Sequence, residues 1–182
     1  MEHKRVYLRQ LHEQDADELL QLRIRNRDYF QAFEPIRSDA HYTLEGQRSD
    51  IQQAAQAFEQ GQSYIFGIFL EESHTLVGRI ALTAVARGPF QNASLGYYLD
   101  QAHQGQGYMA EAVSQCVRYA FETAGLHRIQ AGVMPNNEPS IRVLQRCGFR
   151  YEGLAKRYLQ IHGKWEDHQL YALTVEDGWQ RS

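Results

Sequence analysis

The stretch YYLDQAHQGQGYMAEAV (Tyr97–Val113) decides the fold, because it joins an apolar run, a polar turn and a helix-like segment around two glycines. Gly105 and Gly107 stand directly before residues with helical spacing. A strand that enters such a turn and then a helix directs several unpaired N–H groups at one point, where the helix dipole adds positive charge. Glycine suits these positions because a side chain would hinder close approach or a positive φ. The stretch therefore predicts a backbone site for phosphate or pyrophosphate, with a flexible turn as the alternative.

Two common nucleotide-binding motifs do not fit this stretch. A Rossmann G-x-G-x-x-G would have glycine where Ala110 stands, and it would lie near the first strand instead of in mid-chain. A P-loop would require a following G-K-S/T, which the sequence lacks. An unrelated nucleotide-binding domain stays open as an alternative, one that a preference for NAD or ATP would reveal.

The segments before this stretch predict two helices and four strands. Val6–Leu11 alternates as a half-buried strand does, and His12–Phe33 then has helical spacing up to Pro35. A second helix is expected over Thr43–Gly61, with Thr43 as N-cap and Gly61 as stop. Three further strands at hairpin spacing predict an antiparallel meander: Ser63–Glu72, His74–Arg87 and Ala93–Asp100.

The segments after it predict two more helices and three strands. They are a helix over Tyr108–Gly125, a strand over His127–Met134, a helix from Asn136 or Asn137 to Gly148, and a long hairpin over Arg150–Asp177. The order is β-α-α-β-β-β-α-β-α-β-β, a mixed α/β protein. No linker, repeat or low-complexity segment interrupts it, so residues 1–182 are expected to form a single domain.

Composition excludes several other classes of protein. With 43% hydrophobic and 23% charged residues and a net charge of −3, the chain does not predict a nucleic-acid binder with a broad basic face. No apolar run is long enough for a membrane span, and the polar start does not predict a signal peptide, so a cytoplasmic location is expected. Cys116 and Cys147 are expected to be reduced and buried, and no metal is predicted, since His162 and His168 are only weak ligand candidates.

The heptapeptide Gln104–Ala110, QGQGYMA, resembles the Q/R-x-x-G-x-G/A signature of the GCN5-related N-acetyltransferases (GNAT). The resemblance extends over nearly the whole chain. GYYLD (Gly96–Asp100) matches the family's splayed central strand, and VMPNNEPSIRVLQRCGF (Val133–Phe149) its N-x-x-S/A…GF segment. The tail Gly153–Leu173 resembles the subgroup that acetylates α-amino groups of ribosomal proteins. This resemblance implies a mixed central sheet of the GNAT type with splayed central strands.

The resemblance also implies the roles of individual residues. Tyr97, Tyr98 and Leu99 would pair by backbone with the pantetheine arm of acetyl-CoA, and one of their N–H groups would polarise the thioester carbonyl. Asn137 would hydrogen-bond the same arm, and Ser140 would lie near the thioester sulfur. The pyrophosphate would be held by the backbone amides of Gln104, Gly105, Gln106, Gly107, Tyr108, Met109 and Ala110.

The proton-transfer groups depart from the family pattern. Many members have a tyrosine as the acid for the thiolate at the position of Leu144, so Ser140 becomes the candidate acid, unless it only begins a helix. Ser94 and Leu159 stand where relatives carry acidic residues. The remaining candidate bases are Glu111, Glu138, Glu34 and Asp167, each with a structural alternative, and a water chain is equally open. No base is assigned.

The predicted function is acetyl-CoA-dependent transfer of acetyl directly to a primary amine, namely the N-terminal α-amine of a ribosomal protein. Tyr29, Phe30, Phe33 and Trp165 would wall the acceptor side, or pack in the core. The alternatives are a small amine acceptor (a polyamine, an amino acid or an aminoglycoside-like compound) and a non-catalytic acetyl-CoA-binding module. Neither nucleic acid nor a membrane is expected as partner, and exposed strand edges are compatible with a homodimer.

Overall fold

The computed structural model describes residues 5–179. Met1–Lys4, the first residues of the start used above against a signal peptide, lie outside the described residues. The strands are β1 Val6–Arg9, β2 Tyr64–Leu70, β3 Leu76–Ala86, β4 Asn92–Leu99, β5 Arg128–Val133, β6 Arg150–Ile161 and β7 Lys164–Thr174. The α-helices are α1 Ala16–Arg25, α2 Arg27–Gln31, α3 Leu44–Glu59, α4 Tyr108–Arg118 and α5 Glu138–Arg146.

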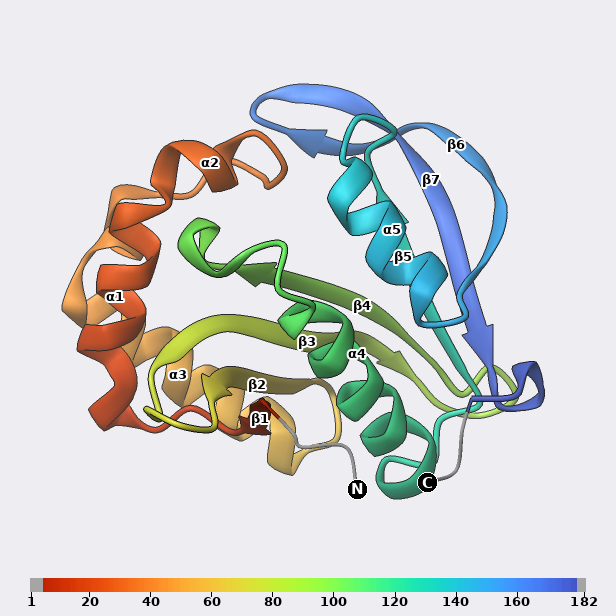
Figure 1. Ribbon diagram of the computed structural model, residues 1–182, viewed down its shortest axis with the longest axis horizontal. Coiled ribbons are helices and arrows are strands. Elements are labelled where there is room, and N and C mark those ends of the chain that lie inside the picture. The colour runs from red at the N-terminus through yellow and green to blue at the C-terminus, as the bar shows by residue number, and fades with distance from the viewer. Residues whose placement is uncertain (1–4, 180–182) are drawn as a thin grey trace.

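The seven strands form one mixed sheet in the order β1-β2-β3-β4-β5-β7-β6. All neighbours are antiparallel except β4 and β5, which pair in parallel only over Asn92–Ser94 and Arg128–Gln130. Beyond these three residue pairs the two strands separate, as Figure 1 shows. The predicted meander, the mixed sheet and the splayed central strands are thus confirmed. Leu95–Leu99 are left with backbone groups that β5 does not pair.

The first predicted helix is broken at Asn26. The buried Asn26 side chain donates to Leu22 O (2.9 Å) and to a carboxylate oxygen of Asp100 (3.2 Å), and it accepts from the Gln101 N–H (2.9 Å). These bonds tie the helix to the loop after β4, and the chain restarts as the short helix α2. The single helix expected over His12–Phe33 is therefore wrong in this detail. Asp100 and Gln101, which bond to the Asn26 side chain, lie 74 and 75 residues further along the chain, so local periodicity could not predict the break.

Helix ends follow the predicted local signals. Thr43 Oγ1 accepts from the Gly46 N–H (3.1 Å), and Asn137 Oδ1 accepts from the Ser140 N–H (3.3 Å). Gly46, a poor helix former, is required by packing, because a Cβ there would lie 1.9 Å from the Ala40 carbonyl oxygen. The helix expected to run on to Gly125 instead changes to a π turn over Tyr119–Thr123.

The main core lies between the sheet and the helices α4 and α5, and a smaller apolar cluster lies beneath α1 and α3. Figure 1 shows α4 and α5 crossing one face of the sheet and α3 on the other. Cys116 is buried in the main core, where burial raises the pKa of its thiol to about 12. Cys147 is also a free thiol but is only partly buried, contrary to expectation, because it follows α5 near the surface. No helix within residues 5–179 is long and apolar enough to cross a membrane.

Candidate active site

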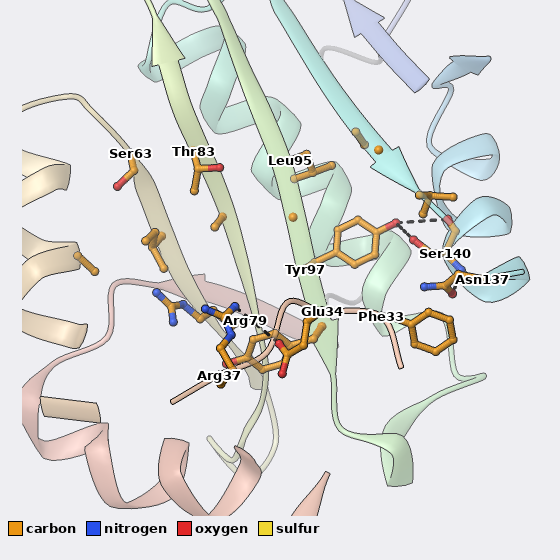
Figure 2. Close-up of a pocket in the computed structure, with 18 of the residues that line it drawn as sticks. Phe33, Glu34, Arg37, Ser63, Arg79, Thr83, Leu95, Tyr97, Asn137 and Ser140 are labelled. Atoms are coloured by element: carbon orange, nitrogen blue, oxygen red, sulfur yellow. Dashed lines mark hydrogen bonds and ion pairs between the residues drawn. The ribbon is translucent and has the colours of Figure 1, made fainter. Parts of the chain in front are cut away.

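Two cavities meet where β4 leaves β5. We call the first, of about 510 Å³, the loop cavity, because the turn between β4 and α4 lines it. The second, of about 600 Å³, is the sheet cavity, which lies over β2, β3 and β4 and under α3 (Figure 2). Six residues line both: Phe33, Glu34, Tyr97, Tyr98, Asn137 and Ser140. Molecules bound in the two cavities would therefore touch at these residues.

The loop cavity collects nearly all of the residues predicted to bind a cofactor. It is lined by Tyr97, Tyr98, Leu99, Gln104, Gly105, Gly107, Tyr108, Met109, Ala110, Asn137 and Ser140. Gln106 is the exception: it does not line the cavity, and its carbonyl oxygen accepts a hydrogen bond from Arg5 Nη1 (2.8 Å). Arg5 also holds its guanidinium 5.2 Å from the Tyr108 ring centroid, so this arginine supports the turn from outside.

The glycines of the turn are there for backbone conformation. Gly105 has φ +74° and Gly107 has φ +82°, in the left-handed region that L side chains rarely adopt. Gly107 is the N-cap of α4, so the first N–H groups of that helix follow it directly. A Cβ at Gly105 would meet nothing within 4 Å, and at Gly107 only the end of the Arg5 side chain. The turn can thus present bare N–H groups at a helix N-terminus, the arrangement that suits a phosphate.

Sequence reasoning missed two cations of this cavity. Arg142 and Arg146 lie one turn apart on α5 and both line it. Arg142 pairs with the exposed Glu138 (3.1 Å), whereas Arg146 has no ion pair among residues 5–179. The sequence did hold a signal for them, because two arginines four residues apart after the Asn137 cap lie on one face of a helix. Guanidinium groups of this kind bind phosphate oxygens well.

Ser140 contacts the side chain of Tyr97 at the junction of the cavities. The Tyr97 phenol lies 2.9 Å from Ser140 Oγ and 3.3 Å from the Ser140 carbonyl oxygen, as Figure 2 shows. Burial raises the pKa of this phenol, so it stays protonated and can act as a donor. Ser140, in the first turn of α5, thus also has a side-chain partner on β4. The resemblance implied only a backbone role for Tyr97, and its side-chain contact could not be read from spacing.

Small side chains form the floor of the sheet cavity. Ala81 and Thr83 lie on β3, Gly96 lies on β4, and Ser63 precedes β2. A Cβ added at Gly96 would meet nothing within 4 Å. On the opposite side α3 presents two further small residues, Ala54 and Ala57. These small residues leave open space over the middle strands of the sheet.

Charged groups gather at one end of the sheet cavity. Glu34 forms ion pairs with Arg23 and with Arg37 (3.7 Å). The Arg23 side chain is only 2% exposed, and its guanidinium lies 4.8 Å from the Tyr98 ring centroid. Burial acts to lower the pKa of Arg23, but Tyr98 and Glu34 outweigh it and the net pKa is raised, so Arg23 stays charged. Arg79 of β3 lines the same end.

Of the four candidate bases, only Glu34 lines a cavity. Glu111 accepts from the N–H groups of Arg5 (2.8 Å) and Val6 (3.2 Å), so it fixes the start of β1 to α4. Glu138 is exposed and paired with Arg142, as described above. Asp167 accepts from the Arg157 N–H (2.8 Å), which supports an irregular turn of β6. Each of these three has a structural role, and Glu34 is itself occupied by two arginines.

A histidine that sequence reasoning weighed only as a metal ligand lines the sheet cavity. His168 of β7 is 3% exposed, and its Nδ1 lies 3.0 Å from the Glu166 carbonyl oxygen. Because a carbonyl only accepts, Nδ1 is the donor in this hydrogen bond, and Nε2 is the ring nitrogen left without a hydrogen-bond partner within the described residues. His162, its supposed co-ligand, lies in the turn before β7, and residues 5–179 contain no group of three potential metal ligands.

Of the aromatic residues considered in the first helical region, Phe33 alone lines the sheet cavity. Tyr29, Phe30 and Phe33 line the loop cavity, and Tyr29 donates to Gln104 Oε1 (3.3 Å). Trp165 lines neither cavity and is 62% exposed, because it lies beside the tip of the β6–β7 hairpin. It is therefore no part of the wall for which it was considered.

Comparison with known proteins gives one consistent result. A family model described as an acetyltransferase (GNAT) domain matches residues 5–150. The protein named Probable N-acetyltransferase YjcK of Bacillus subtilis (strain 168) is 47% identical over 174 residues, which cover 96% of each chain. The ribosomal protein uS5-alanine N-acetyltransferase of Escherichia coli (strain K12) is 37% identical over 95% of this chain and 89% of its own.

The similarity extends to a solved structure. Mycobacterium smegmatis RimJ, solved in complex with CoA-disulfide, superimposes with a TM-score of 0.90 at 31% identity. The match covers 94% of this chain and 83% of that one. Sequence and fold therefore agree along almost the whole chain.

Proposed function

The chain belongs to the GNAT acetyltransferase family, and from this premise we propose that it transfers the acetyl group of acetyl-CoA to the N-terminal α-amine of a protein, in particular a ribosomal protein. The observation that carries the proposal is the meeting of two cavities at Tyr97 and Ser140. A direct transfer between two substrates needs such a junction. The uS5-alanine acetyltransferase relative supports the choice of acceptor.

Acetyl-CoA is assigned to the loop cavity. Its pyrophosphate would accept from the amides around Gly105 and Gly107 at the N-terminus of α4, and Arg142 and Arg146 would add positive charge. The pantetheine arm would pair with the backbone of β4 that β5 leaves free. Asn137 uses Oδ1 to cap α5, which leaves its NH₂ group to donate to the arm. The CoA complex of the RimJ neighbour supports this assignment.

The acyl transfer then needs one donor and one acceptor of protons. The neutral amine attacks the thioester carbonyl, a β4 N–H stabilises the developing oxyanion, and collapse expels the CoA thiolate. Ser140 Oγ–H would protonate that thiolate while Oγ takes the proton of the Tyr97 phenol 2.9 Å away, and the phenol would regain a proton from solvent after the products leave. Holding both substrates at one junction supplies much of the rate gain.

His168 is our candidate for the proton acceptor on the amine side. Its Nδ1 donates to the Glu166 carbonyl, and the residue lines the cavity assigned to the acceptor, so Nε2 would be the nitrogen that takes up a proton there. Glu34, by contrast, is neutralised by Arg23 and Arg37. The proton of the attacking amine would pass to His168 Nε2 directly or through water.

The shape of the sheet cavity favours a peptide end over a small amine. Its floor of Ser63, Ala81, Thr83 and Gly96 follows neighbouring strands, which suits an extended backbone. A compact amine would leave most of the cavity empty. Acetylation of small amines and non-catalytic acetyl-CoA binding remain as the alternatives to exclude.

The test combines cofactor binding, an acceptor panel and one cavity-filling variant. Calorimetric titration should show acetyl-CoA binding in preference to NAD and ATP, and thiol release should follow addition of peptides with ribosomal-protein N-termini. Gly96→Val should raise the peptide KM about tenfold or more, because the side chain enters empty space in the sheet cavity, while acetyl-CoA affinity stays unchanged.

Ala86→Val, a similar enlargement on β3 outside both cavities, is the matched control and should leave the peptide KM unchanged. Turnover of small amines but no peptide would contradict the proposed acceptor. Cofactor binding without turnover on the whole panel would contradict catalysis.

A further inference from the structure

Arg79 brings into the sheet cavity a positive charge that has no counter-charge. It lies on β3, lines the cavity and is half-buried. Among residues 5–179 no carboxylate lies within ion-pair distance of its guanidinium, whereas Arg23 and Arg37 in the same cavity are both paired. Arg79, Arg37 and Glu34 line the same cavity and are labelled in Figure 2.

The carboxylates of the cavity are already engaged elsewhere. Glu34 is shared by Arg23 and Arg37, and giving it up would leave the almost wholly buried Arg23 without a partner. Asp50 bonds to His41 Nδ1 (3.2 Å). Burial, Arg23 and Arg37 lower the pKa of His41. Arg79 lies within ion-pair distance of neither carboxylate, so the carboxylate of a bound molecule would supply its charge partner.

The position of Arg79 relates that partner to the reacting amine. In the sheet Arg79 lies directly opposite Tyr98 of β4, one of the residues at the junction of the two cavities. Adjacent strands are about 4.8 Å apart, and an extended chain advances about 3.3 Å per residue. An acceptor whose amine lies at the junction would thus bring its second or third residue to Arg79.

We propose that the sheet cavity selects acceptors that carry a carboxylate next to the reacting amine, namely peptides with Asp or Glu as the second or third residue, and that Arg79 binds this carboxylate. A guanidinium presents two parallel N–H donors to a carboxylate, which adds geometric selectivity to charge attraction. The proposal rests on the proposed function. The α-carboxylate of a free amino acid offers the same chemistry from another source.

The first experiment compares acceptors on the wild-type enzyme. Octapeptides that begin with alanine and differ only in Glu, Gln or Lys at position two, or at position three, are acetylated under identical conditions, with free alanine and glutamate as further acceptors. We expect kcat/KM for the Glu peptide to exceed that for the Gln peptide about tenfold at one of the two positions, and the Lys peptide to be poorest.

The second experiment changes the arginine. Arg79→Gln should bring the Glu/Gln ratio of kcat/KM close to one, and Arg79→Glu should favour the Lys peptide over the Glu peptide. Arg48→Gln is the matched control: Arg48 is an exposed arginine of α3 outside both cavities, and its loss should leave the ratio unchanged. Titration of each variant with CoA verifies that it is folded.

The outcomes separate this inference from the function on which it rests. Equal kcat/KM for Glu and Gln peptides in the wild type, or an unchanged ratio in Arg79→Gln, would overturn the role of Arg79 while leaving N-terminal acetylation intact. Preference for free amino acids over every peptide would overturn the peptide source of the carboxylate. Absence of turnover on the whole peptide panel would instead count against the proposed function.

Discussion

At the scale of single residues, Gly105 and Gly107 are positions where the backbone conformation, and not a lack of space, favours glycine. Both have a positive φ, and neither would crowd a Cβ against backbone. Gly107→Ala should cost about 1 kcal/mol of stability and lower CoA affinity at least about tenfold, because the turn must shift the N–H groups that follow it. Calorimetric titration with CoA measures the affinity.

Gly88→Ala is the control for this prediction. Gly88 has φ +69°, a Cβ there would meet nothing within 4 Å, and it lies in the turn between β3 and β4 outside both cavities. It should show a similar loss of stability with normal CoA affinity. If both variants bind CoA equally well, the turn is not the pyrophosphate site.

The contact between Tyr97 and Ser140 gives a second prediction at this scale. Tyr97→Phe removes the phenol 2.9 Å from Ser140 Oγ, and Ser140→Ala removes the hydroxyl itself. Each should lower kcat, Ser140→Ala by about a hundredfold and Tyr97→Phe by somewhat less, with CoA affinity unchanged. Because the phenol acts through the serine, the double variant should be no slower than Ser140→Ala alone. Multiplicative losses in kcat would show that the two residues act independently.

His168 gives the third prediction at the scale of single residues. His168→Gln keeps a side chain of similar size but removes the basic nitrogen from the sheet cavity. We expect the single-turnover rate to fall about a hundredfold while peptide affinity changes little, and added imidazole to restore part of the rate. His127→Gln, an exposed histidine outside both cavities, serves as the comparison. A wild-type rate in His168→Gln would contradict this role and would favour a water chain as the acceptor of the amine proton.

At this scale the sequence predicted where the residues of the local backbone turn lie, but it did not predict side-chain contacts between distant parts of the chain. The glycine turn can be recognised from seven consecutive residues, Gln104–Ala110, and all the predicted cofactor-binding residues but Gln106 line one cavity. Tyr97, Arg79 and His168 reach their partners or their cavity from separate strands. No spacing along the chain encodes those approaches.

At the scale of elements, the break between α1 and α2 is stabilised by a buried polar network. Asp100 accepts from Arg25 Nε (2.8 Å), from Asn26 Nδ2 (3.2 Å) and from the Ala102 N–H (3.1 Å). Burial acts to raise the pKa of this carboxyl, but these hydrogen bonds outweigh it and the net pKa is lowered. The network holds α2, which carries Tyr29 and Phe30 of the loop cavity, against the loop after β4.

This network predicts a pH dependence of stability. The folded pKa of Asp100 lies below its ordinary value of 3.8, so its contribution is fully present above that pH and is lost as the pH falls through the folded pKa. Asp100→Asn should therefore lower the free energy of unfolding by about 2 kcal/mol at pH 7, with the difference from wild type narrowing toward pH 2. Urea denaturation across this range measures it.

Asp39→Asn provides the reference, since Asp39 is exposed and makes no ion pair among residues 5–179. It should change the free energy of unfolding little at any pH. A constant deficit of Asp100→Asn down to pH 2 would contradict the role assigned to the ionised carboxylate.

Elements whose ends depend on adjacent residues were predictable, and those shaped by distant partners were not. Thr43 and Asn137 cap their helices through residues three positions away, so both caps are legible in sequence. The break at Asn26 depends on Asp100 and Gln101, and the partial exposure of Cys147 depends on how α5 packs. Such features come from tertiary structure.

At the scale of the whole molecule, the order of the elements and the mixed sheet were predictable, but the organisation of the chain as one domain and its assembly state stay predictions. Exposed apolar side chains gather on the edge strand β6, at Tyr151, Leu154, Tyr158 and Leu159. These side chains are compatible with a homodimer but do not identify its interface. The cytoplasmic location likewise stays a prediction.

The separation of β4 from β5 has a kinetic consequence. Each cavity has lining residues of its own on either side of the six that they share, so neither substrate has to pass through the site of the other. The shape of the cavities therefore imposes no order of substrate binding. On the proposed function, acetyl transfer requires both substrates to be bound at once. Initial-rate measurements at several fixed concentrations of the second substrate should give intersecting double-reciprocal lines. Parallel lines would instead indicate an acetylated enzyme intermediate that forms before the acceptor binds. Acetyl-CoA and the acceptor would then not be bound at the same time.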